Sequence, residues 1–131
     1  CGAVHAGWRG TVAGVATALL DAMVSEAGVR PADVRVAVGP CIGACCFEVG
    51  PEVVEAFRAA FPDADVVVPG PHKPHVDLRR ANRLLLERAG VPAGAITTSG
   101  ACTRCDPERR FFSYRRDAGI NGQQVGFVCR G

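Results

Sequence analysis

The sequence predicts an α+β fold in which a mixed β-sheet is covered by helices and an antiparallel hairpin closes the chain. Three observations lead to this prediction. Short apolar runs typical of strands alternate with longer segments of helical periodicity. Apolar residues make up 48% of the 131 residues, enough to bury the core of one domain. Residues 111–129 contain two strand-like runs around a turn, and strands joined in this way pair antiparallel.

The first half of the chain alternates between strands and helices. Thr11 is a suitable N-cap for a helix, and Gly28 is a suitable residue to end it. Pro51 favours the first turn of a second helix. The predicted elements are, in order, a strand over 1–5, a helix over 11–27, a strand over 34–38 and a helix that begins at Pro51 and ends before Pro62.

The second half repeats the alternation and then changes to the hairpin. Asp77 is a good N-cap for a third helix, which Gly90 ends. The predicted elements are a strand over 66–68, a helix over 78–89, a strand over 96–98, and hairpin strands over 111–116 and 123–129 with a turn over 117–122.

Composition and charge exclude several classes of partner. The net charge of +2 is too small to indicate a nucleic-acid partner, and charged residues amount to 21%, a globular value. No apolar run approaches the roughly 20 residues that a membrane helix needs. We therefore expect neither nucleic acid nor a membrane as a partner, and the sequence leaves the oligomeric state open.

The cysteines and the first residue indicate the compartment and the extent of the domain. Seven cysteines, an odd number, without a signal peptide are typical of a reduced, cytoplasmic protein. The chain starts at Cys1, inside a strand-like run, and not at Met. We therefore expect 1–131 to be a single domain that is the C-terminal part of a larger one.

The segment 4–10 places His5 where a strand ends and a glycine-rich turn begins. Such positions often carry active-site residues, and a neutral imidazole is a good zinc ligand. Arg9 follows near a helix N-terminus, so the two features together suit a phosphate. The alternative is a structural histidine and a surface arginine.

Two cysteine-rich segments suggest a metal site or a redox site. Residues 39–46 hold three thiols among glycines, and Cys102 and Cys105 form a CxxC pair. A CxxC pair can be redox-active or half of a zinc site, and with the first segment it can complete a four-cysteine site. No sequence argument shows that the two segments meet, and small buried cysteines in a tight turn are the alternative.

Residues 111–117 combine aromatic side chains with arginines. Phe111, Phe112 and Tyr114 can stack a flat base, and Arg115 and Arg116 can hold a phosphate. The alternative is a strand with one apolar face and an arginine-rich end.

Four sequence blocks resemble, in order, the signature of the laccase-domain or multicopper polyphenol oxidase family. The blocks are HAGWRGT at 5–11, GPCIG at 39–43 with CCFEVG at 45–50, HVDL at 75–78 with ANR at 81–83, and CT at 102–103 with Asp106 and FFSYRRD at 111–117. Members of this family are understood as zinc purine nucleoside phosphorylases that also deaminate adenosine. The resemblance therefore implies that adenosine, inosine, guanosine or methylthioadenosine is cleaved with inorganic phosphate.

The resemblance also implies roles for individual residues. The family's zinc site has two histidines and one cysteine, and His5 corresponds to the second histidine, a catalytic metal ligand. The other two ligands have no counterpart here, which leaves His5 short of the three ligands that a catalytic zinc needs. Arg9, Arg115 and Arg116 are the candidates for the phosphate, because guanidinium binds it bidentately. Gln123 stands where the family usually has an arginine.

Two other functions stay open from the sequence. The first is a copper-dependent polyphenol oxidase, although such copper sites use many histidines and this chain has three. The second is a non-catalytic structural-zinc or redox module built from Cys41, Cys45, Cys46, Cys102 and Cys105. Glu48 and Asp106 are candidates for a general acid or base.

Overall fold

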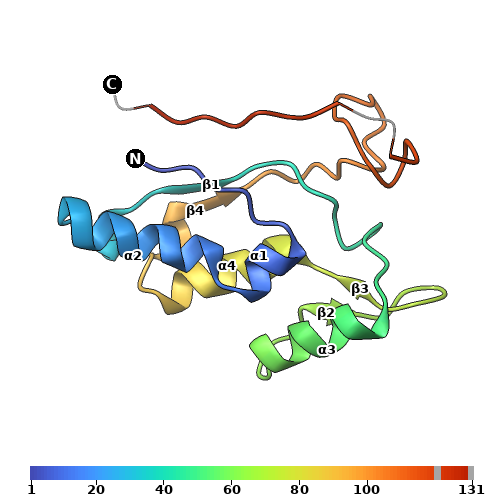
Figure 1. The fold of residues 1–131 in the computed structure, drawn as a ribbon, viewed down its shortest axis with the longest axis horizontal. Coiled ribbons are helices and arrows are strands. Elements are labelled where there is room, and N and C mark those ends of the chain that lie inside the picture. The colour runs from blue at the N-terminus through green and yellow to red at the C-terminus, as the bar shows by residue number, and fades with distance from the viewer. Residues whose placement is uncertain (120–121, 130–131) are drawn as a thin grey trace.

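The computed structural model describes residues 1–119 and 122–129 and confirms the α+β class (Figure 1). The helices are α1 (Trp8–Val12), α2 (Val15–Ala27), α3 (Pro51–Ala60) and α4 (Leu78–Arg88). The strands are β1 (Val36–Val38), β2 (Val67–Val68), β3 (His75–Val76) and β4 (Ile96–Thr98), with short 3₁₀ turns at Pro31–Asp33 and Ala93–Ala95. No helix among the described residues is long and apolar enough to span a membrane.

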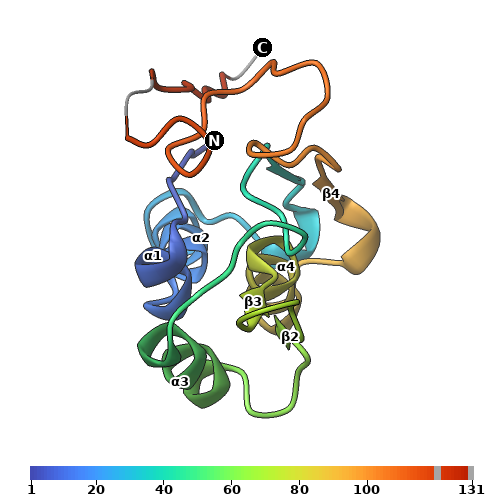
Figure 2. The same cartoon turned by 90° about the vertical axis from the view of Figure 1, so that its right-hand side faces the viewer.

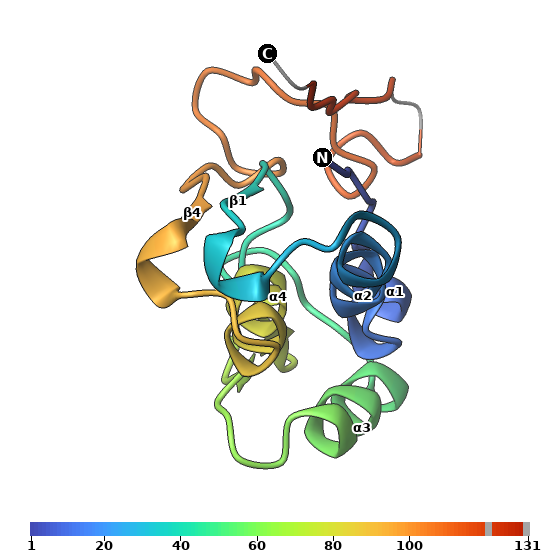
Figure 3. The same ribbon diagram turned by 90° about the vertical axis from the view of Figure 1, so that its left-hand side faces the viewer.

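The strands pair in both directions, but in two small sheets. β1 pairs parallel with β4, and β2 pairs antiparallel with β3. Helices α2 and α4 lie on one side of the β1–β4 pair, and residues 105–119 and 122–129 run on the other side (Figures 1 and 3). The described part of the chain therefore has both kinds of pairing, but in two sheets and not in one mixed sheet, and its antiparallel pair is β2–β3 and not the predicted hairpin.

Helix α4 joins the two apolar clusters of the core. The larger cluster packs α3 against β3 and α4, and includes the stacked rings of Phe57 and Phe61, whose centroids are 5.9 Å apart. The smaller cluster joins Leu20 of α2 and Leu86 of α4 to Ile96 of β4. Because α4 takes part in both clusters, it lies at the centre of the arrangement (Figure 2).

The helix predicted over 11–27 is interrupted, which corrects the role of Thr11. Gly14 adopts a left-handed conformation with φ 74°, which breaks the segment between α1 and α2. Glycine adopts this conformation at little cost. Thr11 is not an N-cap; it lies inside α1, fully buried, and its hydroxyl accepts a hydrogen bond of 2.9 Å from Asn82.

The predictions of a strand over 1–5 and of a C-terminal hairpin were wrong. Residues 1–5 are exposed coil, residues 111–119 form turns, and 122–129 contain no strand. The backbone N–H and C=O groups of a strand need hydrogen-bond partners on a neighbouring strand. The Ser113 carbonyl accepts instead from the backbone N–H groups of Arg116 and Asp117, within its own turn. Part of the predicted turn, residues 120–121, lies outside the described residues.

The buried aromatic pair generates the first prediction. Replacing Phe57, which has 0% of its surface exposed, with alanine removes a ring that α4 and β3 pack around. We expect Phe57→Ala to lower the free energy of unfolding by about 3–5 kcal/mol, measured by urea denaturation. Val24→Ala, at an exposed position of α2, is the control and should change it far less. Equal losses in both variants would contradict this core.

Candidate functional site

The parallel pair β1–β4 brings two distant loops together. The strands pair in the register Val36↔Ile96, and beyond them, with the register shifted by one residue, Cys41 forms a parallel bridge with Cys102. The backbone N–H of Thr103 donates to the Cys41 carbonyl at 3.0 Å. The carboxyl ends of parallel strands lie at the same edge of a sheet. The loop after β1 therefore packs against the loop after β4.

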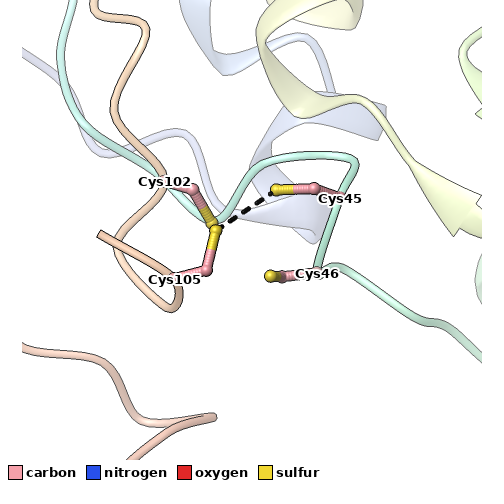
Figure 4. A group of neighbouring side chains, drawn as sticks. All are labelled: Cys45, Cys46, Cys102 and Cys105. Atoms are coloured by element: carbon pink, nitrogen blue, oxygen red, sulfur yellow. Dashed lines mark hydrogen bonds between the residues drawn. The ribbon is translucent and has the colours of Figure 1, made fainter. Parts of the chain in front are cut away.

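These loops place four cysteines in one group, the four-cysteine cluster (Figure 4). Its members are Cys45, Cys46, Cys102 and Cys105, and all four sulfurs lie within 4.8 Å of one another. The sulfurs of Cys45 and Cys105 are 3.6 Å apart. Cys46 and Cys102 are buried, whereas Cys45 and Cys105 are exposed. The cluster is positioned to bind a metal ion.

The thiols of the cluster differ in their tendency to ionise. Burial disfavours the Cys102 thiolate, but backbone N–H donors outweigh it and lower the pKa of Cys102 to about 6. The Gly43 N–H is the foremost of them and donates to the Cys102 sulfur at 3.2 Å. Desolvation and the neighbouring thiols raise the pKa of Cys45. The metal-free cluster therefore favours a thiolate at Cys102 over one at Cys45.

Arg79 of α4 ties both loops to the helix. Its guanidinium donates to the Cys41 sulfur at 3.4 Å and to the carbonyls of Gly100 and Ala101 at 3.1 and 3.4 Å. Burial raises the pKa of the Cys41 thiol, and Arg79 opposes that shift only in part. Arg79 also lines an open cavity of about 600 Å³ beside the cluster, together with Asp77 and Arg110.

The structure places His5 away from the cluster, in the exposed segment before α1. Among the residues that the structure describes, the four-cysteine cluster is the one group of three or more potential metal ligands close enough to share an ion. His5 therefore offers a single ligand. The residues of this chain do not fit the two-histidine, one-cysteine zinc site that the resemblance implied.

Arg9 and Arg115 are exposed, and each lies over an aromatic ring of the larger core cluster. The Arg9 guanidinium carbon is 4.3 Å from the ring centroid of Trp8. The Arg115 guanidinium carbon is 5.6 Å from that of Phe47, and Arg115 also donates to the Glu48 carbonyl at 2.9 Å. Phe47 belongs to this cluster, and the partly buried Trp8 packs against it. The two arginines therefore lie on the surface of the larger core cluster.

Arg116 is engaged within the protein. It donates to the carboxylate of Asp117 at 2.8 and 2.9 Å, and to the carbonyls of Thr103 and Phe111 at 3.2 and 2.9 Å. The hydrogen bonds from Arg116 lower the pKa of Asp117. Most of the N–H donors of Arg116 are used to fix the turns of residues 111–119, which leaves few for a phosphate.

Next to these turns, aromatic and basic side chains line an open cavity of about 530 Å³. Its walls include Phe111, Phe112, Arg109 and Arg110. The candidate acid Asp106 is held by Arg110 at 2.6 Å, and that contact lowers the pKa of Asp106. Of the segment that the sequence singled out, Phe111, Phe112 and Arg116 line this cavity, and the segment forms no strand.

A family model described as multi-copper polyphenol oxidoreductase laccase matches residues 1–131. The chain belongs to this laccase family. The match covers every residue of the sequence, so all four signature blocks fall inside it. The resemblance stated from those blocks is confirmed.

Curated relatives and a solved structure agree with this assignment. Purine nucleoside phosphorylase YlmD of Geobacillus stearothermophilus is 40% identical over 98% of the chain, which covers 48% of that protein. Adenosine deaminase RL5, from an unknown prokaryotic organism, is 50% identical over 89% of the chain, which covers 45% of that protein. The crystal structure of Geobacillus YlmD matches 91% of the chain with a TM-score of 0.83 and 40% identity, over 45% of its own length. The chain spans less than half of each of them.

The sequence suggested a four-cysteine site but left open whether the two cysteine loops meet, and the structure brings them together. The strands over 34–38 and 96–98 were both predicted, and each precedes a cysteine-rich loop. A parallel pairing of those two strands would have placed the loops at one edge. Strand pairing is non-local and had no marker in the sequence. The sequence therefore predicted both strands but not their pairing.

The ion pair between Arg116 and Asp117 generates a pH prediction. Its contacts hold the pKa of Asp117 below the ordinary 3.8. A carboxyl group with a lowered pKa stabilises the fold above its unfolded pKa, and the contribution disappears as the pH falls through the folded value. We expect Asp117→Asn to lower the urea midpoint at pH 7, and the difference from the wild type to shrink once the pH falls below about 3.8 and to vanish below the lowered pKa of the folded state.

The matched control is Asp63→Asn, an exposed carboxyl in the loop after α3. It should leave the midpoint nearly unchanged across the same pH range. A wild-type advantage over Asp117→Asn that stays constant down to pH 3 would show that the ion pair does not stabilise this segment.

Proposed function

We propose that this chain is the C-terminal part of a purine nucleoside phosphorylase. The observation that carries the proposal is the identity of 40% over 98% of the chain with the phosphorylase YlmD. The rest of the domain lies outside the 131 residues. The proposed substrates are adenosine, inosine, guanosine and methylthioadenosine, with inorganic phosphate. The name of the relative RL5 supports adenosine deamination as a second activity.

In phosphorolysis, an oxygen of inorganic phosphate bonds to C1′ of the ribose while the bond to the purine nitrogen breaks. The protein must therefore hold a dianion beside the sugar. Arg9 and Arg115 suit this role, because both are exposed and both stack on rings of one rigid core. Stacking limits the rotamers of a guanidinium and so lowers the entropy lost when phosphate binds. Arg116 serves instead to position the turns that carry Arg115.

The cavity lined by Phe111 and Phe112 suits a flat base. Rings supply a stacking surface, and the guanidinium groups of Arg109 and Arg110 are close enough to interact with phosphate or with purine nitrogens. We propose this cavity as the purine side of the site. The open wall would be closed by residues outside this chain.

His5 is the proposed contribution of this chain to the zinc site. It offers one ligand, and the described residues supply no partner for it. In the proposal, the remaining ligands come from outside residues 1–131. A cytoplasmic, reducing compartment suits a protein whose seven cysteines are all free thiols in the described structure.

A copper-dependent polyphenol oxidase is the alternative, and the description of the family model favours it. The ligands available in the described residues are mainly thiols, whereas such copper sites rely on histidine. Metal analysis of the active protein distinguishes the two functions. Turnover that follows zinc supports the phosphorylase, and turnover of phenols that follows copper supports the oxidase.

The phosphate proposal predicts separate effects on substrate affinity and on turnover. In a form extended upstream, Arg9→Ala and Arg115→Ala should each raise KM for phosphate by about tenfold to a hundredfold, the loss of one charge-assisted contact. His5→Ala should abolish turnover. The assay is chromatography of adenosine incubated with phosphate, in which adenine or inosine is the product.

The control is Arg30→Ala, a surface arginine paired with Asp33 away from α1. It should leave KM for phosphate unchanged. The 131-residue chain, assayed in parallel, should be inactive if the missing zinc ligands lie upstream. Unchanged turnover in His5→Ala would refute the role of His5, and no purine release from the extended form would refute the activity.

A further inference from the structure

We propose that the four-cysteine cluster is a structural zinc site that fastens the loop after β1 to the loop after β4. The cluster takes no part in the phosphorolysis proposed above, and the site stands independently of it. It also differs from the site expected at His5, because it uses four thiolates and no histidine.

The spacing of the sulfurs fits a tetrahedral ion. Zinc–sulfur bonds of about 2.3 Å place the sulfurs of a tetrahedral site about 3.8 Å apart. Cys45 and Cys105 are already at 3.6 Å, and no pair in the cluster exceeds 4.8 Å. The four sulfurs come from two loops and point toward a common centre (Figure 4). Shifts of about 1 Å are enough to reach the ideal geometry.

The number and kind of ligands indicate a structural role. Four protein thiolates fill every position of a tetrahedral zinc ion and leave none for water or substrate. Cys46 and Cys102 are buried at the base of the cluster, whereas Cys45 and Cys105 are exposed at its mouth. The ion can therefore enter from solvent, and once bound it is held between the two loops.

The surroundings compensate the charge of such a site. Zinc with four thiolates carries two negative charges, which hydrogen-bond donors around the sulfurs stabilise. The Gly43 N–H donates to the Cys102 sulfur, and the Arg79 guanidinium lies against the same turn. A Cβ on Gly43 would lie 2.8 Å from Arg79 Nη2 and 3.2 Å from the Cys45 sulfur. A side chain at position 43 would therefore displace the Arg79 guanidinium and press on the Cys45 sulfur.

Disulfides explain the arrangement less well. A disulfide needs two sulfurs to approach to about 2.05 Å and makes no demand on a second pair. Here all four sulfurs converge, including those of the adjacent Cys45 and Cys46, which a turn directs to one point. Among metals, soft thiolates select zinc, copper(I) and iron, and a tetrahedral four-sulfur set suits zinc or iron. Zinc needs no redox partner, and we assign it.

The test uses the 131-residue chain, purified under reducing conditions and analysed for zinc, iron and copper by mass spectrometry. We expect about one zinc per chain. Replacement of zinc by cobalt should give the intense sulfur-to-cobalt charge-transfer bands of a tetrathiolate. Cys45→Ser and Cys105→Ser, at the exposed positions, should each lose zinc and weaken those bands.

Two controls separate the cluster from its neighbours. Cys41→Ser lies in the same loop outside the cluster, and His5→Ala removes the residue proposed for the catalytic zinc; both should keep the zinc and the cobalt bands. The proposal would be overturned if the chain held iron or copper in place of zinc, or if both serine variants retained zinc. It would also be overturned if the cluster cysteines formed disulfides in protein purified under reducing conditions. Absence of cobalt charge-transfer bands in the wild-type chain overturns it whether or not the variants fold. None of these readouts depends on phosphorolysis.

Discussion

The parallel pairing of β1 with β4 is the contact on which the site depends. Each strand has three residues, and past them a bridge between Cys41 and Cys102, shifted by one residue in register, continues the pairing of the two segments. A pair this short has few hydrogen bonds of its own and is marginal without packing on its face. Ile96 supplies that packing against Leu20 and Leu86, and Arg79 adds hydrogen bonds at the carboxyl end.

Contacts of helix α4 and of the residues just before it fix the positions of the neighbouring elements. The start of α4 is fixed by Asp77, whose carboxylate accepts from the Arg80 N–H at 3.0 Å. One turn later, Asn82 donates to the buried hydroxyl of Thr11, so α1 takes its position from α4. Just before the helix, the Nδ1 of His75 donates to the Ala44 carbonyl, next to the first cysteine of the cluster. Helix α4 thus positions α1, which carries Arg9, and strand β3 just before it contacts the cysteine loop.

The sequence predicted helix starts correctly, because the residues that mark them act locally. Asp77 and Pro51 marked the starts of α4 and α3 correctly, because caps act within one turn. The break at Gly14 was missed, because helical periodicity continues across it and only the left-handed φ reveals it. A strand was predicted over 111–116, where the structure has none, because alternation of aromatic and basic residues does not record which partner the backbone finds.

The cysteine cluster and the proposed phosphate residues are coupled through short contacts. Thr103 lies between two cysteines of the cluster, and its carbonyl accepts from Arg116 at 3.2 Å. Glu48 follows Cys46 by two residues, and its carbonyl accepts from Arg115 at 2.9 Å. The loop after β1 therefore binds Arg115, and the loop after β4 binds Arg116. The contacts of Arg115 and Arg116 therefore depend on how the two loops lie against each other, and the hydrogen bond between the Thr103 N–H and the Cys41 carbonyl is one contact that fixes this arrangement.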